Sequence, residues 1–85
     1  MQIKYSSKAR KQLSRIVKSD KRNAKRIVER IEQYAENPSG SYDIKALKGK
    51  RASFLRLRVG DYRIIFEIEK VTMLIYEINH RQESY

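Results

Sequence analysis

The segment Arg56-Leu57-Arg58-Val59-Gly60-Asp61-Tyr62-Arg63 decides how this 85-residue chain folds. Apolar and charged residues alternate along it with the period of two that is typical of a β-strand, and Gly60-Asp61 is a two-residue loop that suits a type II′ turn. A hairpin closed by this loop pairs Val59 with Tyr62 and places Arg58 directly opposite Arg63. Because two like charges that face each other on a sheet are destabilising, we expect an anion, such as a phosphate, to bind between them.

Three strands are expected in the C-terminal half of the chain, at residues 53–59, 61–68 and 71–79. In the first two, the alternation places the apolar residues on one face, which predicts a core surface for helices to cover. The third is apolar on both faces, as expected of a central strand. The core-facing positions of the first two strands are Leu55, Leu57, Val59, Tyr62, Ile64, Phe66 and Ile68.

The alignment of the third strand depends on the turn before it. If Glu69-Lys70 closes the second hairpin, Arg63 pairs with Tyr76 and the two side chains share a face. His80 continues the parity of Tyr76 if the strand extends that far. We therefore expect His80 on the face that carries the arginines.

The N-terminal half is expected to contain a short strand followed by two helices. Residues 2–5 alternate, Ser6 or Ser7 offers an N-cap, and an apolar stripe then runs to about Lys18. Asp20 can cap a second helix, which Asn37-Pro38 ends. The order predicts one α+β domain over residues 1–85, with an N-terminal strand, an antiparallel helix pair and a three-stranded antiparallel sheet (β-α-α-β-β-β). The helical stripes are Ala9, Leu13, Ile16 and Val17, then Ala24, Ile27, Val28, Ile31, Tyr34 and Ala35.

The charge of the chain is strongly positive, because 20 Lys and Arg face 10 Asp and Glu and give a formal net charge of +10. Such a surplus on a small domain indicates an anionic partner, with nucleic acid first and an acidic protein second. A basic surface that serves only solubility is the plain alternative. The positions expected to contact RNA or the ribosome are Lys21, Arg22, Lys25, Lys48, Lys50 and Arg51.

Several classes of protein are disfavoured by what the chain lacks. It has no cysteine, and no apolar run approaches the length that crosses a bilayer, so we expect a cytoplasmic protein without membrane attachment. One histidine and no cluster of carboxylates argue against a metal site, and the three glycines do not build a phosphate-binding loop. We expect no metal and no small-molecule cofactor.

The arginine face and the C-terminus together carry groups that suit RNA cleavage. RNA supplies its own nucleophile, the ribose 2′-OH, so the protein must remove a proton, stabilise the crowded phosphorane and protonate the leaving oxygen. Arginine stabilises charge but is a poor proton donor, since its pKa is above about 12. A lone histidine at a strand end is more often an ordinary surface residue, and a terminal tyrosine can simply pack on a sheet edge. The candidate catalytic residues are Arg56, Arg58, Arg63, His80, Arg81 and Tyr85.

The chain resembles the RelE/ParE toxin superfamily of type II toxin-antitoxin systems. The resemblance lies in Leu47-Lys48-Gly49, in the hairpin over 54–68, and in Ile78-Asn79-His80-Arg81 with Tyr85. In the RelE branch it implies a ribosome-dependent, metal-independent endoribonuclease that cuts mRNA and inhibits translation. The functional residues of that branch fall on Arg56, Arg58, Arg63, Arg81 and Tyr85.

Two positions depart from the RelE pattern. Arginines stand where lysines occur on the first hairpin strand, which weakens any proton transfer from that strand, and His80 precedes Arg81 and can take over acid-base work. In the ParE branch the same fold implies a toxin that inhibits DNA gyrase without nuclease activity. An RNA-binding domain without catalysis is a third possibility. The resemblance also implies a cognate antitoxin whose acidic or amphipathic segment covers the basic groove.

Overall fold

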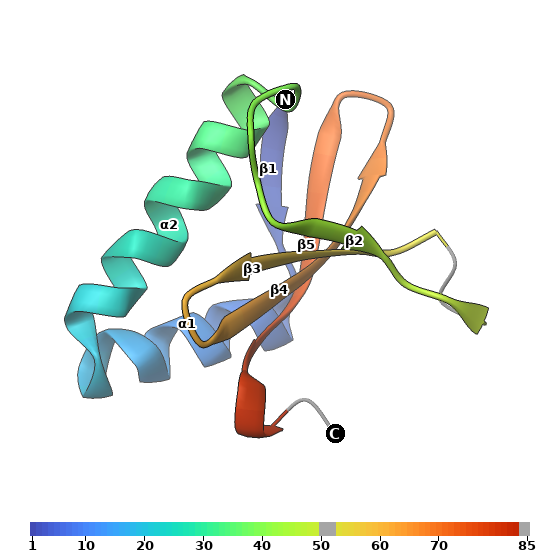
Figure 1. The fold of residues 1–85 in the computed structure, drawn as a ribbon. Coiled ribbons are helices and arrows are strands. Elements are labelled where there is room, and N and C mark those ends of the chain that lie inside the picture. Colours follow the sequence, from blue (N-terminus) through green and yellow to red (C-terminus); the bar gives the residue numbers. More distant parts are fainter. Residues whose placement is uncertain (50–52, 84–85) are drawn as a thin grey trace.

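The computed structural model describes residues 1–49 and 53–83 and shows an α+β fold in which two helices cover one face of a single sheet (Figure 1). The sheet has five strands in the order β1-β5-β4-β3-β2. The predicted fold class is therefore confirmed. The elements are β1 (Gln2–Tyr5), α1 (Ser7–Ser19), α2 (Lys21–Glu36), β2 (Ile44–Ala46), β3 (Leu55–Val59), β4 (Tyr62–Glu69), β5 (Thr72–His80) and the 3-10 helix η2 (Arg81–Glu83).

The chain has one strand more than the sequence predicts, and the sheet has five strands where the sequence predicts three, because β2 and the N-terminal strand β1 both join it. β2 is only three residues long and pairs antiparallel with β3, with Ile44 opposite Leu57. Such a short segment has too few residues to show an alternating pattern, and its extended form is set by pairing with its neighbour. At the other edge, β1 runs parallel to β5, which is therefore an interior strand as expected.

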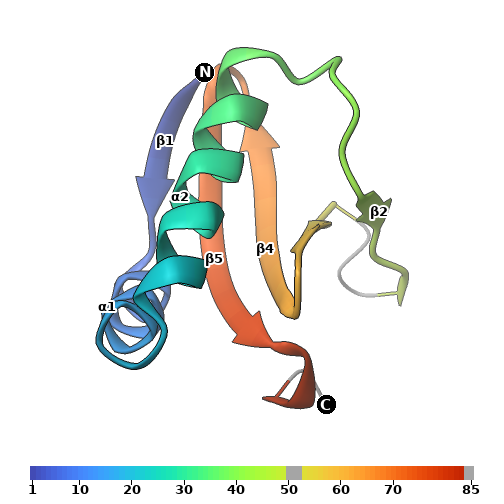
Figure 2. The same cartoon turned by 60° about the vertical axis from the view of Figure 1, so that its left-hand side comes forward.

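Both helices begin at the caps that the sequence indicates. The Ser6 hydroxyl accepts a hydrogen bond from Ala9 N at 2.9 Å, and the Asp20 carboxylate accepts one from Asn23 N at 3.3 Å. The helices diverge from Asp20, so that α2 runs along the sheet while α1 lies across its end (Figures 1 and 2). Of the helices in the described ranges, none combines the length and apolar character needed to cross a membrane.

The core lies between the helices and the predicted apolar face of the hairpin. Phe66 at its centre is fully buried, and its ring lies 5.3 Å from that of Tyr34 in an edge-on contact. Two predicted core positions are wrong: Val17 is 46% exposed and Ile68 is 39% exposed. Each lies at the margin of the covered face, where the apolar stripe extends beyond the opposing element. The buried core residues are Ala9, Ile16, Ala24, Ile27, Ile31, Tyr34, Ala35, Leu57, Val59, Tyr62, Ile64, Phe66, Met73, Ile75 and Ile78.

The first hairpin has the predicted register and the second does not. Val59 pairs with Tyr62, and Arg58 pairs with Arg63, across a loop in which Gly60 has φ 58°. The conditional register for the second hairpin is wrong because β4 continues to Glu69, so that Lys70 and the following valine form the loop.

A β-bulge changes the alignment of β5 further. The register shifts between Ile65 and Phe66, whose partners on β5 are Glu77 and Ile75, so Tyr76 is the extra residue. An extra residue on one strand reverses the parity of everything beyond it. Arg63 consequently pairs with Asn79 and not with Tyr76, and His80 pairs with Tyr62 on the helix-covered face.

The end of β5 is held by α1 where β1 no longer reaches. The Gln12 side chain donates to Asn79 Oδ1 and accepts from Ile78 N, each at 2.7 Å. Ser6 Oγ donates to the Tyr76 carbonyl at 2.8 Å. These contacts satisfy backbone groups at the bulged part of the strand and fix the position from which the C-terminal residues start.

Each hairpin has one loop residue with a positive φ angle, and glycine is expected to be the more stable residue at both positions. Lys70 has φ 56°, a left-handed conformation that disfavours residues with a side chain. We expect Lys70→Gly to raise the free energy of unfolding by about 0.5–1 kcal/mol. Gly60→Ala, at the matching position of the first hairpin, should lower it by about 1 kcal/mol. Urea denaturation measures both, and changes of the same sign would contradict this explanation of the turns.

Candidate nucleic-acid interface

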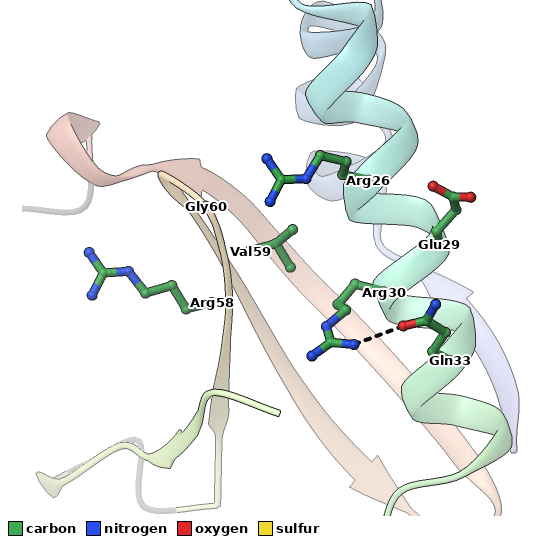
Figure 3. Close-up of a pocket in the computed structure, with 7 residues that line it drawn as sticks. All are labelled: Arg26, Glu29, Arg30, Gln33, Arg58, Val59 and Gly60. Carbon is green, nitrogen blue, oxygen red and sulfur yellow. Dashed lines mark hydrogen bonds between the residues drawn. The ribbon is translucent and has the colours of Figure 1, made fainter. Parts of the chain in front are cut away.

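The arginine pair of the first hairpin lies on the face of the sheet that the helices leave open, which we call the outer face. Arg58 and Arg63 occupy directly opposite positions on β3 and β4, and both are half-buried. Figure 3 shows the Arg58 side chain pointing away from α2. Directly opposite residues have Cβ atoms about 5 Å apart, so one phosphate can contact both guanidinium groups.

Arg56 lies on the same face but is bound more tightly to the protein. It is only 8% exposed, and its Nη2 forms an ion pair with Asp43 Oδ1 at 2.9 Å. Its Nε has no hydrogen-bond partner in the described part of the chain. The structure therefore brings Arg56 beside the arginine pair in a position where it can orient its neighbours, with less of its surface available to a ligand.

Arg81 is held at the tip of the same hairpin. Its backbone N–H donates to the Asp61 carbonyl at 2.7 Å, and its Nε lies 3.7 Å from Asp61 Oδ1. Both views show η2 and the β3–β4 turn at the same end of the molecule (Figures 1 and 2). The Arg81 side chain is 54% exposed, so a third guanidinium lies at the hairpin tip beside Asp61 and remains accessible.

His80 does not lie on the outer face, which corrects the parity expected from the sequence. Its ring packs edge-on against Tyr62 with the centroids 5.2 Å apart, and it lines a small cavity of about 170 Å³ beside α1. The bulge at Tyr76 is the cause, because it shifts His80 to the face of Ile78. His80 is the last residue of β5, and the next residue, Arg81, is hydrogen-bonded to the hairpin tip, so His80 lies near that tip.

An aromatic pair lies on the outer face, where the sequence placed Tyr76 beside the arginines but did not indicate Phe54 as its partner. Phe54 and Tyr76 stack with centroids 4.9 Å apart and an interplanar angle of 5°. The Tyr76 hydroxyl donates to Glu67 Oε1 at 3.1 Å. Phe54 precedes Arg56 by two residues, so the alternation of β3 was the signal that places it on this face. Stacked aromatic side chains beside guanidinium groups suit a nucleobase next to its phosphate.

Tyr76 gives a prediction for stability at high pH. Burial, and then the hydrogen bond to Glu67, raise the pKa of the Tyr76 phenol above its ordinary value of about 10. A raised pKa in the folded state means that the contribution to stability is complete below about pH 10 and is lost as the pH rises through the folded value. We expect Tyr76→Phe to make the alkaline loss of stability shallower, as measured by urea denaturation at pH 8 to 12. An unchanged pH profile would contradict this.

The basic positions that were expected to contact RNA are not all gathered at the outer face. Lys21, Arg22 and Lys25 are exposed on α2, on the opposite side of the sheet, around a shallow apolar depression with Val28. Lys48 is exposed after β2. Within the described ranges, no group of three or more side chains could hold a metal ion. The predicted positions Lys50, Arg51 and Tyr85 lie outside the described residues.

The fold and the arginine-bearing hairpin define the class of protein. A sheet with an N-terminal strand, a covering helix pair and antiparallel C-terminal strands is the architecture of the RelE/ParE toxin superfamily. The family model described as the ParE toxin of type II toxin-antitoxin systems (parDE) matches residues 3–85, so this chain belongs to that family. The chain is therefore a toxin of a type II toxin-antitoxin system. Among curated proteins, no match is found.

Solved structures of related toxins share the fold. A YoeB/ParE toxin from Agrobacterium tumefaciens is 14% identical with a TM-score of 0.82, over 94% of this chain and 98% of that one. The toxin-antitoxin complex RelBE2 from Mycobacterium tuberculosis contains a chain that is 23% identical, with a TM-score of 0.78 over 94% and 96%. A RelB-RelE antitoxin-toxin complex from Methanococcus jannaschii contains one that is 28% identical, with a TM-score of 0.72 over 92% and 89%.

Proposed function

We propose that this toxin is a ribosome-dependent endoribonuclease that cleaves mRNA and inhibits translation, and that it needs no metal. The observation that carries the proposal is the pairing of Arg58 with Arg63 on the open face of the sheet, with Arg81 held at the same hairpin tip. Guanidinium groups placed this close can contact one phosphate together. The aromatic pair beside them adds a surface on which a base can stack.

The chemistry follows from what the arginines can and cannot do. The 2′-OH attacks the adjacent phosphorus, the bond to the 5′-oxygen breaks, and a 2′,3′-cyclic phosphate remains. Arg58, Arg63 and Arg81 neutralise the negative charge that builds up on the phosphorane, which is the step that positioned cations accelerate most. Arg56, which is bound to Asp43, orients the strand that carries Arg58.

Proton transfer falls to His80 and Tyr85, because arginine remains protonated at neutral pH. The ring of His80 lies on the helix-covered face against Tyr62, and His80 is the last residue of β5. His80 can therefore act only on a phosphate that is bound at this end of the strand. Tyr85 would need neighbouring arginines to lower its pKa from about 10 before it could accept a proton. Tyr76 is not suited to act as the base, because its raised pKa keeps it protonated.

The experiment that tests this function is a map of mRNA 5′ ends after brief expression from a tight promoter. Wild type is compared with Arg81→Ala, His80→Gln and Tyr85→Phe. Cuts in phase with codons that disappear in the Arg81 variant support the nuclease, and a treatment that clears mRNA of ribosomes should abolish them. Growth arrest without new 5′ ends would overturn the proposal.

A second candidate function is inhibition of DNA gyrase without nuclease activity. The observation that favours it is the family model, which is that of the ParE toxins and not of the RelE toxins. In that case the basic face would bind protein or DNA. Induction of the DNA-damage response, together with loss of gyrase supercoiling in vitro and intact mRNA, would identify this function.

A cognate antitoxin is the proposed protein partner in either case. The complexes from Mycobacterium tuberculosis and Methanococcus jannaschii contain a toxin with its antitoxin. The net charge of +10 and the open arginine pair suit an acidic segment that covers the outer face. The reading frame next to this one should encode such a protein.

A further inference from the structure

A second basic groove lies between α2 and the tip of the first hairpin, and none of the roles described above uses it. It has a volume of about 430 Å³ and is lined by Arg26 and Arg30 of α2 and by Arg58 of β3 (Figure 3). Arg58 lines the groove, but its side chain points to the outer face. The two anion-binding surfaces meet at the hairpin tip.

The charge of the groove is positive even though it contains one carboxylate. Glu29 also lines it, but Figure 3 shows the Glu29 carboxylate turned away from the hairpin. No ion pair joins Glu29 to Arg26 or Arg30 among the described residues. The two guanidinium groups of α2 therefore line the groove without a neutralising partner from Glu29, while the guanidinium group of Arg58 points away from α2 (Figure 3).

Arg30 is held ready for a ligand by neighbours that do not cancel its charge. Its Nη1 donates to Gln33 Oε1 at 2.9 Å and its Nη2 to the Ser41 carbonyl at 3.0 Å, while its guanidinium lies 4.7 Å from the centre of the Tyr42 ring. Two of its five N–H donors are used in this way, which leaves three for an anion. A side chain that is already ordered loses little entropy on binding.

The hairpin tip lies next to Arg26 at Gly60. A Cβ built on Gly60 would lie 3.7 Å from Arg26 Nη1. The described structure gives Arg26 one hydrogen bond, from Nη1 to Asn23 Oδ1 at 3.2 Å. The groove and the outer face are therefore separated by the two-residue turn Gly60-Asp61, in which the Asp61 carboxylate lies 3.7 Å from Arg81 Nε, and an extended strand can pass over the Gly60 side of the turn.

We propose that this groove binds the sugar-phosphate backbone of the same RNA strand that the outer face cleaves. A phosphate next to the scissile one crosses the Gly60 turn from Arg58 and is bound by Arg26 and Arg30. The contact is independent of base sequence, because the phosphate group is the same at every nucleotide. This proposal rests on the proposed RNA target. It adds the path of the RNA strand, which runs from the outer face over the Gly60 turn toward α2.

The test measures binding of a single-stranded RNA that cannot be cleaved, with 2′-O-methyl groups throughout, by fluorescence anisotropy at several salt concentrations. Arg26→Gln, and Arg26→Gln with Arg30→Gln, are compared with Arg10→Gln and Lys11→Gln, which remove the same charge from α1. We expect several-fold weaker binding, and a salt dependence whose slope falls by about 0.7 for each arginine removed. The α1 variants should keep the wild-type slope. Arg26→Gln alone tests the proposal if the double variant does not fold.

Each other outcome overturns the inference. If the groove variants bind RNA as the α1 variants do, while Arg58→Gln binds weakly, the groove is not part of the RNA path and the proposed function stands. If the wild type does not bind this RNA, the groove inference fails, whereas the proposed function, which acts on ribosome-bound mRNA, is tested separately by the map of mRNA 5′ ends. If the groove variants bind RNA normally but lose affinity for the purified antitoxin, the groove is a protein-binding surface instead.

Discussion

Arg58→Gln is expected to lower RNA cleavage by a factor of about 10² to 10³ with the fold intact. The reason is that Arg58 supplies one of the few positive charges beside the reacting phosphate, and loss of one such group has an effect of this size. Stability should change in the opposite direction, because Arg58 stands directly opposite Arg63. Removal of like-charge repulsion on a sheet is expected to add about 0.2–1 kcal/mol at low salt.

The measurement combines cleavage of a ribosome-bound message with urea denaturation of the purified protein. Arg10→Gln is the matched control, since it removes the same charge from an exposed position on α1. It should leave the cleavage rate close to that of the wild type. A variant at Arg58 that is both less stable and fully active would show that this arginine has a structural role only.

Phe66→Ala should have the largest effect on stability. Phe66 is fully buried at the centre of β4, packs edge-on against Tyr34, and lies between Leu55 and Ile75 in the sheet. Truncation of a buried phenylalanine leaves a cavity and lowers the free energy of unfolding by about 3–5 kcal/mol. A domain of this size has a total stability of the order of 4–13 kcal/mol. The variant therefore loses a large share of its total stability and is expected to unfold at a much lower urea concentration than the wild type.

Ile68→Ala gives the control on the same strand. Ile68 lies two residues further along, on the same face, but is 39% exposed at the margin of the core. Its truncation should lower the free energy of unfolding by less than about 1 kcal/mol. Equal losses for the two variants in urea denaturation would contradict a core centred on Phe66.

The elements that local sequence determines were predicted well. The Ser6 and Asp20 caps, the helical stripes and the Gly60 turn act over a few residues, so the first hairpin and both helices follow from the sequence. β2 and the bulge in β5 depend on pairing with strands elsewhere in the chain, and no local pattern indicates either. The strand partner of Tyr76 could therefore not be predicted, because the bulge falls at this residue.

The residues of the candidate site also differ in whether local sequence or distant packing determines their position. Arg58 and Arg63 could be placed together because their register depends on a two-residue loop between them. His80 could not be placed correctly, since the bulge lies between the turn and its position. On α2, the sequence analysis selected Lys21, Arg22 and Lys25, whereas Arg26 and Arg30 are the basic residues that line the groove at the hairpin, which helical periodicity alone does not tell. That choice is made by the packing of α2 on the sheet.

Whether the arginine hairpin cleaves RNA through the 2′-OH of its own substrate is decided by the chemical identity of the new 3′ ends. Mass spectrometry of fragments released from a ribosome-bound message should find a 2′,3′-cyclic phosphate, in amounts that fall together with the cleavage rate in Arg58→Gln. Fragments that end in a free 3′-hydroxyl, or cyclic phosphate ends formed equally by the Arg58 variant, would contradict it.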